Sequence, residues 1–168
     1  MSTRLARELQ TLCLNHSPAL SLAVAESLTG GRVQAAITAV PGASGFFRGG
    51  LTAYTIEQKV NLLGVNRGVA QRVNAVSAAV ATQMARGAAT LFGADLAVAT
   101  TGYAEPAAAL GVADPFAYWA IAHRLGPRRW QGLTGRVVCP GQKRTEVQAA
   151  VTEAVLAELL AYLKTIAT

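Results

Sequence analysis

The chain has 168 residues, 52% of them hydrophobic and 14% charged, a composition that supports one domain with an ordinary core and excludes a disordered chain. It contains no apolar run long enough to span a membrane, so we expect a cytoplasmic protein without membrane contact. The net charge of +6 suits anionic partners, but the arginines are scattered and form no basic stripe interleaved with aromatic residues, which argues against nucleic-acid binding.

The first part of the chain predicts a helix, a buried strand and a second helix. Residues 2–15 place apolar side chains at helical spacing, with Ser2 or Thr3 as the N-cap. The apolar run 20–25 is typical of a buried strand, and a glycine-containing loop at 26–31 leads from it into another helical pattern. This order is half of a β-α-β unit.

The middle of the chain continues the alternation of strands and helices. Residues 51–55 alternate as in a strand, and residues 57–63 form a short helical pattern. The strongest helical pattern covers 76–92, with Ser77 as its N-cap. A further buried strand is expected at 95–101.

The last third predicts a hairpin followed by a long helix. Two strands, 116–122 and 130–138, are joined by a polar turn and indicate an antiparallel pair. Residues 144–166 form an amphipathic helix. We therefore predict an α/β fold in which residues 1–168 form a single three-layer domain, with a mixed sheet of about five strands and helices on both faces.

The cysteines and histidines do not form a pattern typical of a metal site. Cys13 and Cys139 lie far apart without companion ligands, so we expect two reduced structural thiols. His16 and His123 are also isolated and are expected to be structural. The sequence thus predicts neither a bound metal nor a cofactor.

The first candidate site is the loop at 26–31, between a predicted strand and a predicted helix. Such a loop presents backbone N–H groups and the positive end of the helix dipole. Gly30 and Gly31 would let a ligand approach the backbone, while Ser27 and Thr29 add hydroxyl groups. The alternative is a capped helix start without a ligand.

The second candidate site combines Ser44 on a glycine-flanked turn, Tyr54 near a strand end and Lys59 on the short helix that follows. A serine becomes nucleophilic when a neighbour takes its proton, and a desolvated lysine can do so because burial lowers its pKa. The alternative is a lysine exposed to solvent on a surface helix.

A third candidate is Thr101 with Gly102, at the end of the strand predicted over 95–101. Ligands in open α/β sheets bind at the carboxyl ends of strands, where this hydroxyl would lie. The same threonine could equally cap the strand end.

Five fragments occur together in an order that is similar to one family. They are 26–31 (ESLTGG, family ESCTGG), 40–54 (PGAS followed by GG and Tyr), 59–65 (KVNLLGV), 75–88 (AVS followed by MARGA) and 101–102 (TG). Their order resembles the C-terminal domain of the CinA family, of the nicotinamide-nucleotide amidase type. The similarity covers roughly residues 20–165, nearly the whole chain.

The resemblance implies hydrolysis of the amide of nicotinamide mononucleotide to nicotinic acid mononucleotide and ammonia, without a metal or cofactor. Ser44 would be the nucleophile, and Lys59 and Tyr54 would activate it and relay its proton. The resemblance also implies the residues that bind the phosphorylated substrate: Ser27, Thr29, Gly30, Gly31, Thr101, Gly102 and Arg144, the last of these at its phosphate. A homodimer or higher homo-oligomer is expected from the family and from the high apolar content.

The chain departs from the family mainly in the segment that follows its fifth fragment, residues 101–102. Residues 103–106 (YAEP) stand where the family has IAGP, and three alanines at 107–109 replace glycines. Glu105 brings a negative charge close to the expected phosphate. Leu28 replaces the family cysteine, and Gln148 stands where the family often has a second arginine.

Two alternatives to the amidase therefore remain open. One is a related protein that binds a nucleotide-like ligand without turning it over, or that acts on another amide. The other is a protein-interaction module linked to competence or DNA damage.

Overall fold

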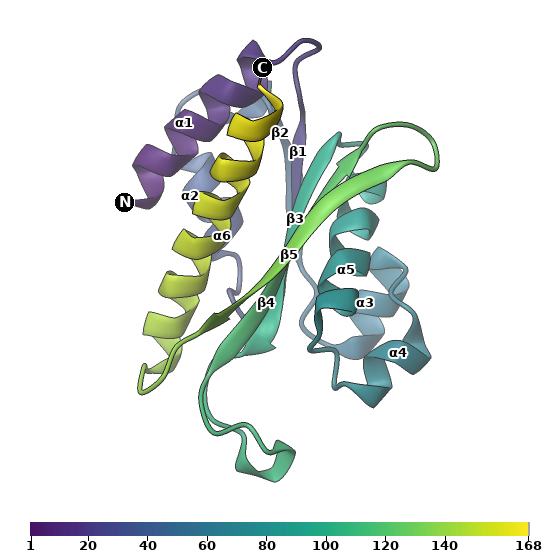
Figure 1. The fold of residues 1–168 in the computed structure, drawn as a ribbon, viewed down its shortest axis with the longest axis vertical. Helices are drawn as coiled ribbons and strands as arrows, with labels where there is room; N and C mark the ends of the chain where they lie inside the picture. The colour runs from purple at the N-terminus through teal and green to yellow at the C-terminus, as the bar shows by residue number, and fades with distance from the viewer. Residues whose placement is uncertain (168) are drawn as a thin grey trace.

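Five strands form one mixed sheet with the order β2-β1-β3-β4-β5 (Figure 1). The computed structural model describes residues 1–167. The strands are β1 (Leu22–Glu26), β2 (Phe47–Thr52), β3 (Leu96–Tyr103), β4 (Phe116–Arg124) and β5 (Trp130–Val138). The first three run parallel, whereas β4 is antiparallel to β3 and to β5. The carboxyl ends of β1, β2 and β3 therefore meet at one edge of the sheet.

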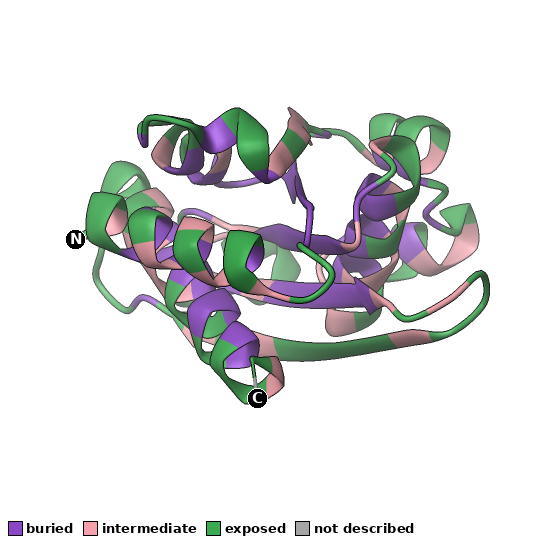
Figure 2. Cartoon of the chain, turned by 90° about the horizontal axis from the view of Figure 1, so that it is seen from above, coloured by how far each residue is buried: buried purple, intermediate pink, exposed green. Residues whose placement is uncertain are grey.

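Helices cover both faces of this sheet, as the sequence predicted. One face carries α1 (Ser2–Asn15), α2 (Arg32–Thr38) and α6 (Arg144–Ile166), and the other carries α3 (Ile56–Leu63), α4 (Arg67–Arg72) and α5 (Ala78–Leu91). Short 3-10 turns lie at η1 (Ala43–Gly45) and η2 (Ala108–Leu110). In Figure 2 the buried positions follow the sheet and the inner sides of the helices.

The two faces differ in side-chain size because side chains alternate along each strand. Towards α1, α2 and α6, the central strands present large residues such as Leu22, Val98 and Ile121. Towards α5 they present alanines such as Ala23 and Ala99. The small side chains let α5 lie close to the sheet, and together the two layers bury the core of the domain.

The predicted hairpin and the final helix are confirmed, and the cap of Ser77 on α5 is confirmed by the hydrogen bond from the Val80 N–H. The helix α4 was not predicted. The strand expected at 51–55 was misplaced, since β2 starts at Phe47 and contains Gly49 and Gly50.

Packing explains why β2 contains two adjacent glycines. A Cβ on Gly49 would lie 2.7 Å from a ring carbon of Phe92, and one on Gly50 would lie 2.8 Å from the side-chain oxygen of Gln34. The strand therefore needs small residues at the places where helices from both faces press on it.

Gly87 offers a test of the packing that holds α3 in place. A Cβ there would lie 2.1 Å from the carbonyl oxygen of Leu63, at the end of α3. We expect Gly87→Ala to lower the free energy of unfolding by about 1–3 kcal/mol, because the two helices must move apart. Urea denaturation measures the loss.

The matched control is Gly68→Ala in α4, where an added Cβ meets nothing closer than 3.5 Å. It should stabilise the domain by about 0.5–1 kcal/mol through helix propensity. Equal effects of the two alanines would contradict the packing argument.

Within residues 1–167, none of the helices combines the length and the apolar character needed to cross a membrane. In the same residues, no three His, Cys, Asp or Glu side chains gather as a metal site. Cys13 and Cys139 are buried free thiols, as predicted. His123 is buried and hydrogen bonded to the hydroxyl of Tyr162 at 2.9 Å, which supports its structural role.

Candidate functional site

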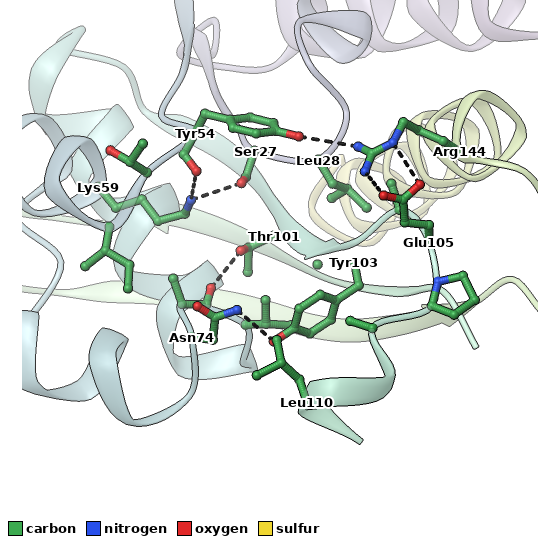
Figure 3. A pocket seen from close by; sticks show the side chains of 18 residues that line it. Ser27, Leu28, Tyr54, Lys59, Asn74, Thr101, Tyr103, Glu105, Leu110 and Arg144 are labelled. Atoms are coloured by element: carbon green, nitrogen blue, oxygen red, sulfur yellow. Dashed lines mark hydrogen bonds and ion pairs between the residues drawn. The ribbon is translucent and has the colours of Figure 1, made fainter. Parts of the chain in front are cut away.

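A pocket of about 440 Å³ opens at the edge where the parallel strands end (Figure 3). Its walls come from segments far apart in the sequence: the loop after β1, the β2–α3 connection, residues 74–76, the end of β3 with the loop that follows it, and the head of α6. In α/β sheets this edge is the usual place for a ligand.

Lys59 occupies the interior of this pocket wall. The chain turns from β2 directly into α3, where the Thr55 side chain caps the first turn by accepting from the N–H of Gln58. Helix side chains lean towards the N-terminus of their helix, so Lys59 reaches back to the strand ends. Only 2% of the residue is exposed.

The amine of Lys59 has three oxygen partners. Its Nζ donates to Ser27 Oγ at 2.9 Å, to the carbonyl oxygen of Ala53 at 2.8 Å and to that of Tyr54 at 3.4 Å. All three are uncharged, so burial lowers the pKa of Lys59 from 10.5 to about 8. The amine can therefore lose its proton at a pH near 8. Of the two alternatives that the sequence left open for Lys59, the structure shows the buried lysine and not the exposed one.

Ser27 is the hydroxyl that this lysine meets. It follows β1 directly, is 7% exposed and lines the pocket. Because β1 and β2 are parallel neighbours, Ser27 lies beside the segment that connects β2 to α3. A serine bonded to a buried amine is an arrangement suited to nucleophilic catalysis.

The structure does not bring Ser44 to Lys59, and this part of the predicted site is corrected. Ser44 is exposed on η1, before the amino end of β2, and does not line the pocket. The six residues of β2 separate it from Lys59, and a strand of that length spans roughly 20 Å. The early start of β2 is what moves Ser44 to the opposite edge.

Tyr54 lies in the pocket wall, but its phenol does not face the amine. Its backbone carbonyl reaches Lys59, while the side chain is 59% exposed and its hydroxyl accepts from Nη1 of Arg144 at 3.4 Å. The predicted convergence of both Tyr54 and Lys59 on one serine is therefore corrected to a pair, Ser27 and Lys59.

The loop at 26–31 is not an open anion site. The buried carboxylate of Glu26 accepts from the N–H groups of Gly31, Val33 and Gln34 at 3.0, 3.2 and 2.9 Å. These are the amides at the start of α2 that the sequence analysis assigned to a ligand. An internal carboxylate already satisfies them, as an N-terminal helix charge should.

Three further residues of this loop, Thr29, Gly30 and Gly31, do not line the pocket. The hydroxyl of Thr29 is buried and pairs with that of Thr100 at 2.8 Å. Gly30 and Gly31 adopt positive φ angles of 61° and 96° and are absent from the pocket wall. Of the four loop residues predicted to bind substrate, only Ser27 lines the pocket.

Thr101, Gly102 and Arg144 all lie at the pocket, as predicted. The Thr101 hydroxyl donates to the carbonyl oxygen of Ala75 at 2.7 Å and so holds one wall in place. A Cβ on Gly102 would lie 2.3 Å from the carbonyl oxygen of Phe116, so glycine is needed there for strand packing. Arg144 sits at the mouth, paired with Glu105.

The wall also contains residues that were not predicted as part of the site, among them Asn74 and Ala75, which precede α5. Both have left-handed backbone, with φ angles of 48° and 57°, and the Asn74 side chain donates to the Tyr103 hydroxyl at 3.2 Å. An asparagine before a helix cap was the one available signal, since asparagine tolerates this conformation.

These features define a class: a three-layer α/β domain with a serine–lysine pair in a pocket at the carboxyl ends of its parallel strands. The chain belongs to the CinA family, because residues 3–163 match the CinA C-terminal domain. The predicted family and fold are thereby confirmed.

Relatives of similar sequence support the assignment to this family. A CinA-like protein of Chlorobium limicola is 38% identical over 155 residues, which are 86% of this chain and 34% of that protein. A CinA-like protein of Shewanella sediminis is 36% identical over 89% of this chain and 34% of its own length. The chain thus spans about a third of the curated relatives it matches.

The structural similarity covers almost the whole chain. A crystal structure of a competence-damaged protein (CinA) superfamily protein from Klebsiella pneumoniae has a TM-score of 0.85 at 27% identity, covering 98% of this chain and 99% of that one. A competence/damage-inducible protein from Agrobacterium tumefaciens has a TM-score of 0.81 at 31% identity, covering 97% and 95%.

Proposed function

We propose that this domain is an amidohydrolase that converts nicotinamide mononucleotide to nicotinic acid mononucleotide and ammonia. The observation that carries the proposal is the hydrogen bond between the buried Lys59 amine and Ser27 Oγ in the pocket. The substrate follows from the resemblance to the nicotinamide-nucleotide amidase type, and the chemistry follows from this pair.

In the proposed first step, Ser27 Oγ attacks the carbonyl carbon of the carboxamide while neutral Lys59 takes its proton. The tetrahedral intermediate collapses, the C–N bond breaks, and Lys59 returns the proton to the departing ammonia. An ester on Ser27 remains.

The second step repeats the transfer with water. Lys59 takes a proton from a water molecule, which attacks the ester carbonyl, and the proton then passes to Ser27 as the C–O bond breaks. The carbonyls of Ala53 and Tyr54 hold the amine in place throughout.

Incubating the purified chain with nicotinamide mononucleotide tests this proposal. We expect ammonia and the acid product in equal amounts, and added hydroxylamine should divert part of the product to the hydroxamate, because it competes with water for the ester. Absence of ammonia release from the mononucleotide and from related nicotinamide compounds would contradict the amidase.

Binding without turnover is the second candidate. The guanidinium of Arg144, which the resemblance assigns to the substrate phosphate, is hydrogen bonded to Glu105. The pocket therefore departs from the family at the place where the substrate would be positioned. A thermal-shift experiment distinguishes the two. Stabilisation by the mononucleotide without ammonia release would favour the binding protein.

A further inference from the structure

Each of the three guanidinium nitrogens of Arg144 already donates a hydrogen bond within the protein at the mouth of the pocket. Its Nε and Nη2 donate to the two carboxylate oxygens of Glu105 at 3.3 and 2.5 Å, and its Nη1 donates to the Tyr54 hydroxyl at 3.4 Å (Figure 3). All three nitrogens of the guanidinium are therefore engaged by the protein itself.

The pocket wall contains three charged residues, namely Lys59, Glu105 and Arg144. The Lys59 amine is held by Ser27 and two carbonyls deep in the wall. At the mouth, the charges of Glu105 and Arg144 cancel, and the pair is bidentate, the strong form of this contact. A ligand entering the mouth thus meets no net positive charge.

Ligands with a phosphate and ligands without one interact differently with the Glu105–Arg144 pair at the mouth. A phosphate that takes the Nε and Nη2 edge of Arg144 must displace Glu105, and one that takes the remaining N–H groups of Nη1 and Nη2 lies close to the bound carboxylate. In both cases the negative charge of Glu105 stays near the phosphate and repels it. A ligand without a phosphate leaves the pair intact. It also meets the ring of Tyr103, which is braced by Asn74, and the apolar side chain of Leu110.

We propose that Glu105 is a specificity-determining residue that makes the pocket a site for unphosphorylated nicotinamide nucleosides as well as for nucleotides. The proposal rests on the amidase function for its reaction, which is the same hydrolysis of a carboxamide to a carboxylate and ammonia. The nucleoside, nicotinamide riboside, is the second substrate.

Binding measured on the Ser27→Ala chain, which cannot form the ester, tests the role of Glu105. Isothermal titration with the mononucleotide and with the riboside should give dissociation constants within about fivefold of each other, because exchanging one exposed ion pair for another releases little free energy. Adding Glu105→Gln should increase the preference for the mononucleotide about tenfold, since a like charge beside the phosphate is removed. Added salt should reduce that preference.

Glu8→Gln is the matched control. Glu8 is an acidic residue on α1 that pairs with Arg4 at 3.4 Å and with Lys164 at 3.6 Å, outside the pocket. It changes the net charge by the same amount as Glu105→Gln, and it should leave the ratio of the two dissociation constants as it was.

Three results would overturn the role of Glu105: a preference for the mononucleotide above about tenfold with Glu105 in place, a ratio that Glu105→Gln does not change, or no binding of either compound. Ammonia assays on the unmodified chain separate this failure from that of the amidase. Binding as expected without ammonia refutes the amidase alone, and ammonia release with a strong preference for the mononucleotide refutes Glu105 alone.

Discussion

Replacing Ser27 with alanine is expected to lower kcat for release of ammonia by roughly 10³–10⁶-fold, because removing a nucleophile removes the whole covalent route. The hydroxyl lies 2.9 Å from the amine that would take its proton. A steady-state ammonia assay with the mononucleotide measures the loss. In the same assay, hydroxamate should no longer form, because no ester is left for hydroxylamine to intercept.

Ser44→Ala is the matched control for this variant. Ser44 is exposed and lies outside the pocket wall, so its hydroxyl should not contribute to the rate. If Ser44→Ala were the inactive variant and Ser27→Ala retained full activity, the proposed nucleophile would be refuted. Circular dichroism confirms that both variants are folded.

Replacing Lys59 with methionine is expected to have opposite effects on activity and stability. Activity should fall about 10²–10⁴-fold, the typical contribution of a general base. The free energy of unfolding at pH 7 should rise by about 1–3 kcal/mol, because a charged amine that is buried with only uncharged oxygen partners is unfavourable. Urea denaturation and the ammonia assay together measure the two effects.

The pH dependence gives the sign of the stability effect. Folding lowers the pKa of Lys59 from 10.5 to about 8, so the unfolded chain holds this proton more tightly. Stability from this residue therefore increases as pH rises from about 8 to 10.5, and the advantage of Lys59→Met should shrink over the same interval. For the unmodified chain, kcat/KM should rise with pH and level off above about 8, as the amine becomes neutral.

Lys164→Met serves as the control, since Lys164 is exposed on α6 and pairs with Glu8. It should change neither the activity nor the pH dependence of stability. A Lys59→Met chain that is less stable at pH 7 and keeps its activity would refute both the cost of burying this amine and its role as a base.

Local patterns predicted most of the elements correctly. The bounds of α6 agree with the helical pattern at 144–166, and the hairpin of β4 and β5 follows from two apolar runs around a polar turn. Such patterns arise from contacts between residues close in the chain, which the sequence states directly. The error at β2 came from Gly49 and Gly50, whose role depends on Phe92 and Gln34, side chains distant in sequence.

The predicted site shows the same difference between what local sequence patterns reveal and what depends on contacts between distant residues. Lys59 could be chosen from sequence as a lysine with a possible catalytic role, but its burial depends on how α3 packs on α5, and its partner depends on which strand lies beside β2. Glu26 looked like part of a ligand loop because no local pattern reveals that a buried carboxylate caps α2.

The sequence by itself determined the family, the alternation of strands and helices, and the residue types available for chemistry at the strand ends. The tertiary structure alone decided which serine meets the lysine. Ser27 and Lys59 are 32 positions apart, and they touch because parallel pairing of β1 with β2 aligns the carboxyl ends of the two strands. Ser44, closer to Lys59 along the chain, lies at the amino end of β2, so the direction of that strand separates the two residues.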